Sequence, residues 1–349
     1  CKSHNHLPGQ WDYSEITPYH RKTDNRQVQR YKCLSCGRTF STQTFSTTYW
    51  QKRPNLDEKI FTHSVNGMAN SQIARVLGCA PSTVDRKLAR QGRHCLLYLL
   101  TMLKAGKQPE EIVYDGLETF EFSQFYPYHL NIAVEKSSDY ILLLNESELR
   151  RKGSMTPQQK EKRICLENQF GRPDPKAIEK STAEIFNFLI DSQPHVRVYT
   201  DKHKQYNQPL QKFGSQVTHF TTSSKEHRGP KNNLFAVNRL DMMLRHGNKN
   251  QTRETIAFSK RRQAGIEKAA VFAVYMNFLM DRRQRGVKDF TPAMARGVVS
   301  RKLTYWDVFA CRAFVFQFEL PGKWKQYYFR EVRTRALPRN KGHTLKFAA

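Results

Sequence analysis

Residues 112–120 read IVYDGLETF, a short run of β-branched, apolar and aromatic residues that predicts a buried β-strand. Asp115 stands at the end of the apolar part of this run, and Gly116 follows it. A carboxylate on a buried strand is costly unless a positive group lies beside it, and a divalent metal ion is the strongest candidate. The stretch therefore predicts a metal site on a strand of a central sheet.

A second run of the same type, HVRVYTD at 195–201, ends in Asp201. Between the two runs, HLNIAVE at 129–135 and YILLLNE at 140–146 predict two strands of a hairpin, and 177–190 predicts a helix. Three strands, a helix and a strand with the second aspartate form the order of an RNase H-like α/β domain. In that architecture, carboxylates from two neighbouring strands and a later helix hold two Mg²⁺ ions.

The composition favours a nucleic-acid partner. The 349 residues include 58 Lys and Arg against 31 Asp and Glu, a formal charge of +27 that is spread along the chain. Such a field attracts polyanions. No apolar run approaches the about 18 residues of a membrane-spanning helix, and seven cysteines, an odd number, favour thiolate metal ligation over a disulfide framework.

A zinc knuckle is predicted by YKCLSCGRTFS at 31–41, where Cys33 and Cys36 have C-x-x-C spacing and Gly37 permits a tight turn. Two sulfurs fill half of a tetrahedral shell, and Cys1 is the third candidate. The fourth ligand is open between a residue preceding Cys1 and three histidines, His4, His6 and His20.

A helix-turn-helix is predicted by NSQIARVLGCAPSTVDRKLARQG at 70–92, with a turn at Gly78 and a second helix from about Pro81. Plain packing of two helices would give the same pattern. Beside a zinc knuckle in a basic chain, DNA recognition is favoured. The second helix is expected to expose a polar and basic set that suits the major groove: Ser82, Thr83, Asp85, Arg86, Lys87 and Arg90.

The combination resembles bacterial insertion-sequence transposases of the DDE class, which have an N-terminal zinc ribbon and helix-turn-helix before the catalytic domain. The resemblance rests on YKCLSCGRTFS, DGLETF at 115–120, YTD at 199–201, NRLDMMLR through RETIAFSKR at 238–261 and, more weakly, TPAMARGV at 291–298. It implies Mg²⁺- or Mn²⁺-dependent cleavage of element ends and strand transfer into target DNA. It also implies double-stranded DNA as partner, a homo-oligomer and a cytoplasmic, nucleoid-associated bacterial protein.

The resemblance implies Asp115 and Asp201 as the first two acids, then a Glu on a helix, an Arg directly after it and another Arg seven residues after the acid. Counting back from RETIAFS places Asn238 at the Glu position, with Arg239 and Arg245 on the Arg positions as DNA-binding candidates. Asp241 would share a helix face with Asn238. Three alternatives stay open: a working site with Asn238, Asp241 as the third ligand, or a domesticated, inactive DNA-binding protein.

Four regions follow from these patterns: a zinc-ribbon-like module at 1–50, a helix-turn-helix at 51–106, an RNase H-like domain at 107–290 and a basic and aromatic extension at 291–349. Residues 147–176 read as an insertion or mobile linker, and 265–280 as an apolar helix on the sheet. The basic clusters at 260–262 and 281–285 are expected on solvated faces. Five aromatic residues of the extension are expected in the core: Trp306, Phe309, Phe314, Phe316 and Phe318.

Overall fold

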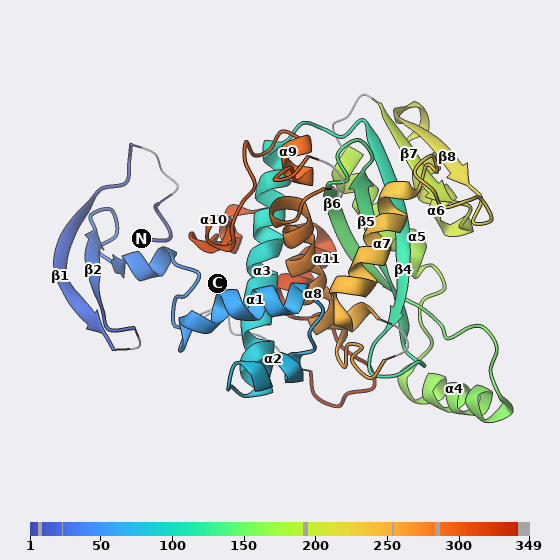
Figure 1. Cartoon of the computed structure of the whole chain (residues 1–349), viewed down its shortest axis with the longest axis horizontal. Coiled ribbons are helices and arrows are strands. Elements are labelled where there is room, and N and C mark those ends of the chain that lie inside the picture. Colours follow the sequence, from blue (N-terminus) through green and yellow to red (C-terminus); the bar gives the residue numbers. More distant parts are fainter. Residues whose placement is uncertain (6–8, 23, 191–194, 253–254, 283–286, 341–349) are drawn as a thin grey trace.

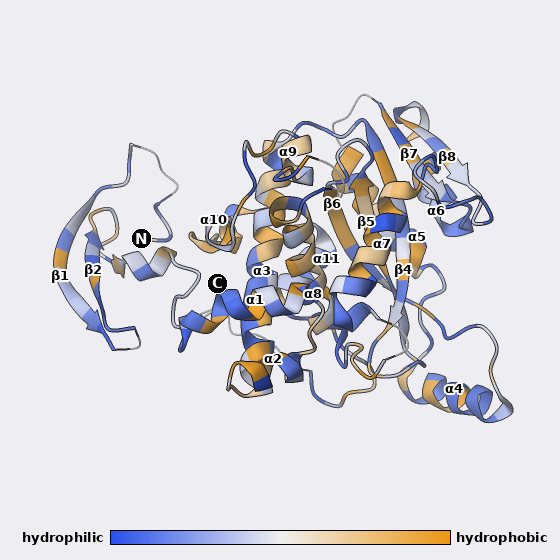
Figure 2. Cartoon of the chain, viewed as in Figure 1, coloured by the Kyte–Doolittle hydropathy of each residue, from blue (hydrophilic) through white to orange (hydrophobic). Residues whose placement is uncertain are grey.

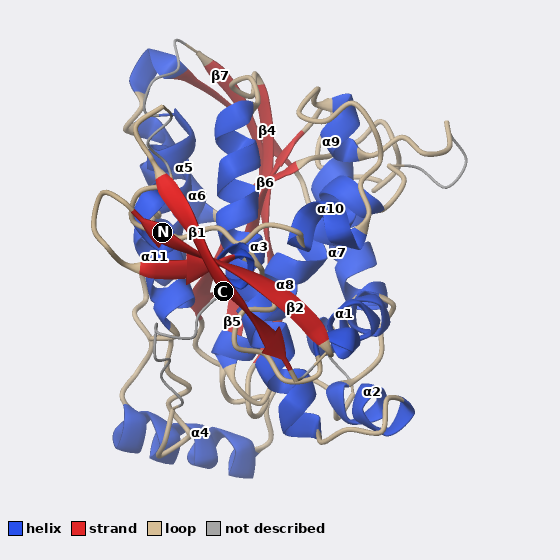
Figure 3. Ribbon diagram, turned by 90° about the vertical axis from the view of Figure 1, so that its left-hand side faces the viewer, coloured by secondary structure: helices blue, strands red, loops and turns tan. Residues whose placement is uncertain are grey.

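Two β-sheets organise the computed structural model, which describes residues 1–5, 9–22, 24–190, 195–252, 255–282 and 287–340 (Figure 1). The small sheet has the order β1-β2-β3 and is antiparallel, with β1 at Tyr13–Arg21, β2 at Arg26–Cys33 and β3 at Thr39–Ser41. Figure 1 shows its long hairpin standing to one side of the larger body, and Figure 3, viewed from that side, shows the hairpin in front of the body. The whole is a mixed α/β structure, as the sequence predicts at this level.

The large sheet has the order β6-β5-β4-β7-β8. Strands β4, β5 and β6 are antiparallel neighbours, whereas β7 and β8 continue the sheet parallel to β4. Their bounds agree with the predicted runs: β4 Glu111–Phe120, β5 Pro127–Glu135, β6 Ile141–Glu148, β7 Val196–Asp201 and β8 Val217–Thr222. The strand that carries Asp115 therefore lies at the centre of the sheet.

Helices cover both faces of this sheet. Tyr114 of β4 contacts α5 (Ala177–Ile190), where its hydroxyl lies 3.0 Å from that of Thr182. Because successive strand residues point to opposite faces, Asp115 points away from α5. Helix α7 (Phe235–Gly247) packs on β4 and β5, and α6 (Lys204–Gln211) follows β7. Figure 2 shows apolar residues concentrated along β4, β5 and β6.

The predicted helix pair is present as α2 (Asn70–Val76) and α3 (Pro81–Ala105), preceded by α1 (Asp57–Val65). Gly78 adopts a left-handed φ of +58° in the turn, which explains the glycine there. The second helix does not end with the predicted stretch at residue 92 but continues to Ala105. Gly92 lets α3 touch α8 (Arg262–Val274), since a Cβ would lie 2.7 Å from the Glu267 carbonyl oxygen.

Residues 147–176 contain helix α4 (Pro157–Phe170), which the sequence analysis did not predict. The signal was present, because Thr156 caps the helix by accepting a hydrogen bond from the Gln159 amide at 3.3 Å, and Pro157 suits the first turn. None of its residues is buried. Figures 1 and 2 show α4 as a largely hydrophilic helix at the periphery of the body.

Two expectations about the C-terminal third need correction. Arg262, predicted on a solvated face, is buried, because it pairs with Glu121, Glu146 and Glu148. The aromatic stretch is only partly in the core: Phe309 and Phe314 are buried, whereas Trp306 and Phe316 are half exposed. Residues 283–285 of the second basic cluster lie outside the described residues.

The apolar helix predicted at 265–280 is α8, extended by a π-helix at Tyr275–Leu279, and it packs on α3 and β6. Among the residues that the structure describes, no helix combines the length and apolar character needed to cross a bilayer. The remaining short elements are 3₁₀-helices at Thr42–Phe45, Pro54–Leu56, Gly214–Gln216, Lys249–Gln251 and Val315–Gln317, and α9 (Pro292–Ala295), α10 (Tyr305–Phe309) and α11 (Gly322–Phe329).

Candidate functional site

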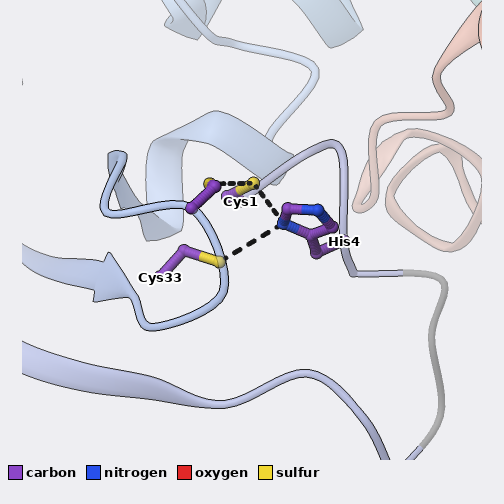
Figure 4. A group of neighbouring side chains, drawn as sticks. Cys1, His4 and Cys33 are labelled. Carbon is purple, nitrogen blue, oxygen red and sulfur yellow. Dashed lines mark hydrogen bonds between the residues drawn. The ribbon is translucent and has the colours of Figure 1, made fainter.

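A cluster of three cysteines and one histidine lies at the base of the small sheet. The ligand atoms of Cys1, His4, Cys33 and Cys36 all lie within 4.8 Å of one another, and Figure 4 shows the side chains converging. The Cys1 and Cys36 sulfurs are 3.7 Å apart, and His4 Nδ1 lies 3.5 Å from the Cys1 sulfur and 3.4 Å from the Cys33 sulfur. The cluster could hold a metal ion such as zinc.

The spacing of these atoms fits a tetrahedral ion. With Zn–S bonds of about 2.3 Å and Zn–N bonds of about 2.0 Å, two sulfurs lie roughly 3.8 Å apart and a sulfur and a nitrogen roughly 3.5 Å apart. The cluster matches both values. Among the histidines proposed as the fourth ligand, His4 lies with the three cysteines. The His20 ring contacts Asn25 instead, and His6 lies outside the described residues.

Local backbone geometry assembles this cluster. The Gly37 amide donates to the Cys33 carbonyl at 2.8 Å, and Gly37 has a left-handed φ of +69°, so both sulfurs of the C-x-x-C turn face inward. The amides of His4 and Asn5 donate to the Cys1 carbonyl, which turns His4 back toward Cys1. Desolvation raises the pKa of the Cys33 thiol, but hydrogen bonds from His4 and from backbone amides outweigh it and lower that pKa to about 6. A thiolate is the form that ligates metal.

A second candidate site is acidic and lies at the centre of the large sheet. The parallel register of β4 and β7 pairs Ile112 with Val198 and Val113 with Tyr199. Two residues further along each strand come Asp115 and Asp201, so the two carboxylates stand at the same level on neighbouring strands and point to the same face. The sequence prediction that these aspartates come together is consistent with this register.

Helix α7 adds a third carboxylate. The negative charge of Asp115 acts on Asp241, and the Oδ1 atom of Asp241 is buried without a hydrogen-bond partner. Asn238, the residue that counting places at the family's Glu position, lies one turn earlier on the same helix and is half-buried. The charge of Asp241 interacts with that of Asp115, whereas the neutral amide of Asn238 brings no charge to the site.

Crowding of acids raises their pKa values. Burial, and then the charge of Asp201, raise the pKa of Asp115 to about 6, although the Gly116 amide, Arg228 and the Tyr206 side chain act in the opposite direction. Burial and the charge of Asp115 raise the pKa of Asp241 to about 8 against the effects of Arg245 and Arg228. Each of these carboxylates is thus harder to ionise than in water, and a bound cation would favour their ionised forms.

The three aspartates are nevertheless spaced more widely than the Cys/His cluster. Within the described part of the chain, the Cys/His cluster is the group of three or more His, Cys, Asp or Glu residues whose ligand atoms all lie within 4.8 Å of one another. Asp115 Oδ1 accepts from the Gly116 amide at 2.7 Å, and Asp201 Oδ1 from the His203 amide at 2.8 Å. These backbone contacts orient the two strand carboxylates.

A cavity of about 1480 Å³ opens beside the acidic cluster. Lys202 and His203, which follow Asp201, form part of one wall, and Glu118 and Phe120 at the end of β4 form another. The segment that carries α4 closes the far side with Arg151, Lys152 and Lys162. Sequence reasoning did not find this cavity, because its walls come from six separated stretches between Glu118 and Phe258.

Some of the predicted DNA-binding residues are accessible on α3. Arg86 is exposed, and Ser82 and Thr83 are half-buried near the start of the helix. Asp85 is exposed and accepts a hydrogen bond from Asn70 of α2. The first two turns of α3 therefore present a polar and basic surface, as the sequence predicts.

Lys87 and Arg90 do not fit the prediction of an exposed recognition face. Lys87 is buried, because its ammonium group forms an ion pair with Asp57 and donates to the Gln51 side chain at 2.7 Å. Arg90 is half-buried and donates to the Tyr49 carbonyl at 2.6 Å. Both side chains anchor residues 49–57 to α3 instead of facing solvent.

The two arginines of α7 lie in different surroundings. Arg239 donates to the Arg282 carbonyl and lies 3.9 Å from the Asp139 carboxylate, with 16% of its side chain exposed. Arg245 lies 3.4 Å from the Glu118 carbonyl, and its charge acts on Asp241. Arg245 therefore belongs to the acidic site, whereas Arg239 joins α7 to the β5–β6 turn.

No protein-family model matches the chain.

Proposed function

We propose that this chain is a DDE-class DNA transposase whose acidic residues are Asp115, Asp201 and Asp241. The observation that carries the proposal is the level placement of Asp115 and Asp201 on neighbouring parallel strands, with Asp241 close to Asp115 from α7. A sheet of three antiparallel strands extended by two parallel ones supports an RNase H-like domain. The +27 charge supports double-stranded DNA as substrate.

The residues fit a site for Mg²⁺ or Mn²⁺. Carboxylate oxygens are the preferred ligands of these ions, and the Asp241 Oδ1 atom is buried and lacks a partner. Burial and a neighbouring carboxylate raise the pKa of Asp115, where the neighbour is Asp201, and that of Asp241, where it is Asp115. When bound, such ions supply charge stabilisation to the phosphodiester that is cleaved.

The chain's own residues would position the reacting groups. Asp115 and Asp201 accept hydrogen bonds from backbone amides within β4 and just beyond β7, while Arg245 and Arg228 supply positive charge next to Asp241. In the proposed reaction, water attacks the phosphorus at the element end and the 3′ oxygen leaves with a proton. That 3′ hydroxyl then attacks a target phosphodiester and displaces a second 3′ oxygen. No covalent bond to the protein is required.

The N-terminal part would serve recognition. The Cys1, His4, Cys33 and Cys36 cluster beside the small sheet supports a zinc ribbon, and the exposed start of α3 supports major-groove contact by the helix-turn-helix. The proposal includes a homo-oligomer, since two element ends must be held together, and association with the bacterial nucleoid.

A domesticated, inactive DNA-binding protein is the second candidate, and Asn238 at the family's Glu position is the observation in its favour. The carboxylate of Asp241 weighs against it, because Asp241 restores the count of three acids near Asp115. The two candidates differ in one property, which is metal-dependent cleavage of DNA.

Incubation of the purified chain with Mn²⁺ and a supercoiled plasmid carrying the DNA that flanks its gene tests the proposal. We expect nicking that is abolished in Asp115→Asn and in Asp201→Asn. Asp289→Asn is the matched control, since Asp289 is exposed, pairs with Lys302 and lies outside both the acidic cluster and the cavity lining. Undiminished nicking in both active-site variants would reject the assignment, and binding without nicking by the wild type would favour the domesticated protein.

A further inference from the structure

The cavity beside the acidic cluster is a basic groove whose floor continues from the catalytic strands. Its near wall follows directly from Asp201, since Lys202, His203 and Lys204 line it, and its far wall is formed by the segment that carries α4. That segment is held in place: Arg150 donates to both carboxylate oxygens of Glu167 at 2.7 and 3.0 Å. This pair joins α4 to the chain that leaves β6, so the far wall of the groove is tied to the sheet.

Cations dominate the rim of this groove. Lys152, Lys162, Arg172, Lys202 and Lys204 line it and are exposed. The opposing carboxylates of the lining are Glu118, Glu148 and Asp174, of which Glu148 is paired with Arg262 and Asp174 with Lys180. Positive charge on both walls favours a phosphate backbone along the groove.

Aromatic rings lie between these cations. Phe120, Phe125 and Phe258 line the groove and are half-buried, so each offers part of its surface to the cavity. Phe120 and Phe258 have ring centroids 4.9 Å apart, and the Lys162 ammonium group lies 5.4 Å from the centroid of Phe125. Residues from β4, from the turn after it and from the segment before α8 thus bring three rings to one groove.

We propose that this groove binds an unpaired strand of DNA beside the cleavage site. Cations that follow the backbone and aromatic rings on which bases stack are the pair of features that single-strand binding requires. A duplex keeps its bases stacked inside and presents phosphates to the protein, so it would leave the three rings without a role. The inference rests on the proposed function, since the DNA strand that leaves the acidic cluster is the one that would enter the groove. The inference adds that the two strands of the DNA substrate are separated at its ends.

Fluorescence anisotropy in EDTA tests the groove separately from catalysis. The probes are a labelled 20-nucleotide oligo(dT) and a labelled 20-base-pair blunt duplex of mixed sequence. We expect Phe125→Ala and Phe258→Ala to weaken oligo(dT) binding by at least about fivefold each, because loss of a stacking ring has an effect of this order. Phe258→Tyr should restore binding, since it keeps a stacking ring. Phe316→Ala is the matched control, as Phe316 is half exposed and does not line the groove.

Two exposed cations provide a test that does not depend on the aromatic positions. Lys162→Gln and Arg172→Gln should each reduce the slope of log Kd against log salt for oligo(dT) by about 0.7. Unchanged oligo(dT) binding in the aromatic and cationic variants would overturn the proposal, and so would a loss confined to the duplex, which would assign the groove to paired DNA. The anisotropy assay contains EDTA and therefore reports binding without catalysis. Loss of nicking in Asp115→Asn, measured with Mn²⁺, tests the proposed function alone. The two results can therefore fail independently.

Discussion

Asp115 and Asp201 stand at the same level on the parallel strands β4 and β7, because the register of these strands pairs Val113 with Tyr199. Backbone amides within β4 and just beyond β7 orient both carboxylates, so their positions depend on the sheet. Asp241 approaches from a helix, and its position depends on the rotation of α7 against the sheet.

The third acid is decided by comparing Asp241→Ala with Asn238→Ala. We expect Asp241→Ala to lower Mn²⁺-dependent nicking by about a hundredfold or more, because it removes a charged ligand next to Asp115. Asn238→Ala should keep nicking within about threefold of the wild type, since an amide contributes no charge. Rates are measured on supercoiled plasmid at saturating Mn²⁺.

Thermal unfolding of both variants is the control, as each substitution lies on the same helix. The reverse pattern, with nicking lost only in Asn238→Ala, would assign the third position to the amide. Equal loss in both variants at unchanged unfolding temperature would mean that the two side chains share the position.

Local patterns were sufficient to predict the strands with the two aspartates. The β-branched runs of β4 and β7 and their order along the chain predict both strands, with one acid near the middle of β4 and the other at the end of β7. The choice between Asn238 and Asp241 could not be made this way, because counting residues does not give the rotation of a helix. That rotation is set by the apolar residues of α7 that pack on the sheet, such as Val237 and Leu244.

Long-range partners explain the other differences. Lys87 reads as an exposed base of a recognition helix, but Asp57, thirty residues earlier, draws it into a buried ion pair. Arg262 is likewise drawn inward by carboxylates more than a hundred residues away. The groove is assembled from segments that share no local pattern. Such features depend on tertiary packing, which periodicity does not encode.

The zinc prediction is tested by the metal content of single-residue variants. We expect about one zinc ion per chain in the wild type, and loss of zinc in Cys33→Ser, because a hydroxyl is a poor replacement for a thiolate ligand. His4→Ala should weaken binding or abolish it. His20→Ala should keep the full content, since the His20 ring contacts Asn25 on the exposed hairpin.

Zinc is measured by mass spectrometry of protein purified without chelators, and affinity by competition with a chromophoric chelator. Full zinc content in His4→Ala together with loss in His20→Ala would place the fourth ligand on the hairpin. Absence of zinc from the wild type would reject the site.

Lys87 and Arg86 should separate stability from DNA binding. Lys87→Ala leaves Asp57 buried without its cation, and we expect the free energy of unfolding to fall by about 3–5 kcal/mol. Arg86→Ala should leave it within about 0.5 kcal/mol, because Arg86 is exposed. The same Arg86 variant should weaken binding of double-stranded DNA.

Urea unfolding and anisotropy with a blunt duplex measure the two effects. The double variant Lys87→Met, Asp57→Asn should recover part of the lost stability, since it removes both buried charges together. If Lys87→Ala weakened DNA binding without destabilising the fold, Lys87 would be a DNA contact that the free protein conceals.

The imidazole of His94 predicts a pH-dependent stability. His94 is buried, its Nε2 donates to the Val308 carbonyl at 2.8 Å, and its ring lies 5.0 Å from that of Phe309. Burial, with a smaller contribution from the Arg312 charge, lowers the pKa of His94 to about 4, even though the Val308 carbonyl acts in the opposite direction. In the unfolded chain a histidine has a pKa of about 6.5.

The unfolded state therefore binds more protons than the folded state at pH values between these two pKa values, so stability falls as the pH is lowered from about 6.5 toward 4. For His94 alone, the expected loss between pH 7 and pH 5 is about 2 kcal/mol. His94→Gln keeps a side-chain donor but does not titrate, so the wild type should lose this much more than the variant over the same range. Urea unfolding of both proteins at pH 7, 6 and 5 measures the difference. Loss of the ring contact with Phe309 changes the free energy of unfolding of the variant by the same amount at every pH. Parallel pH dependences in the two proteins would therefore show that His94 accepts a proton in the folded state as readily as in the unfolded chain.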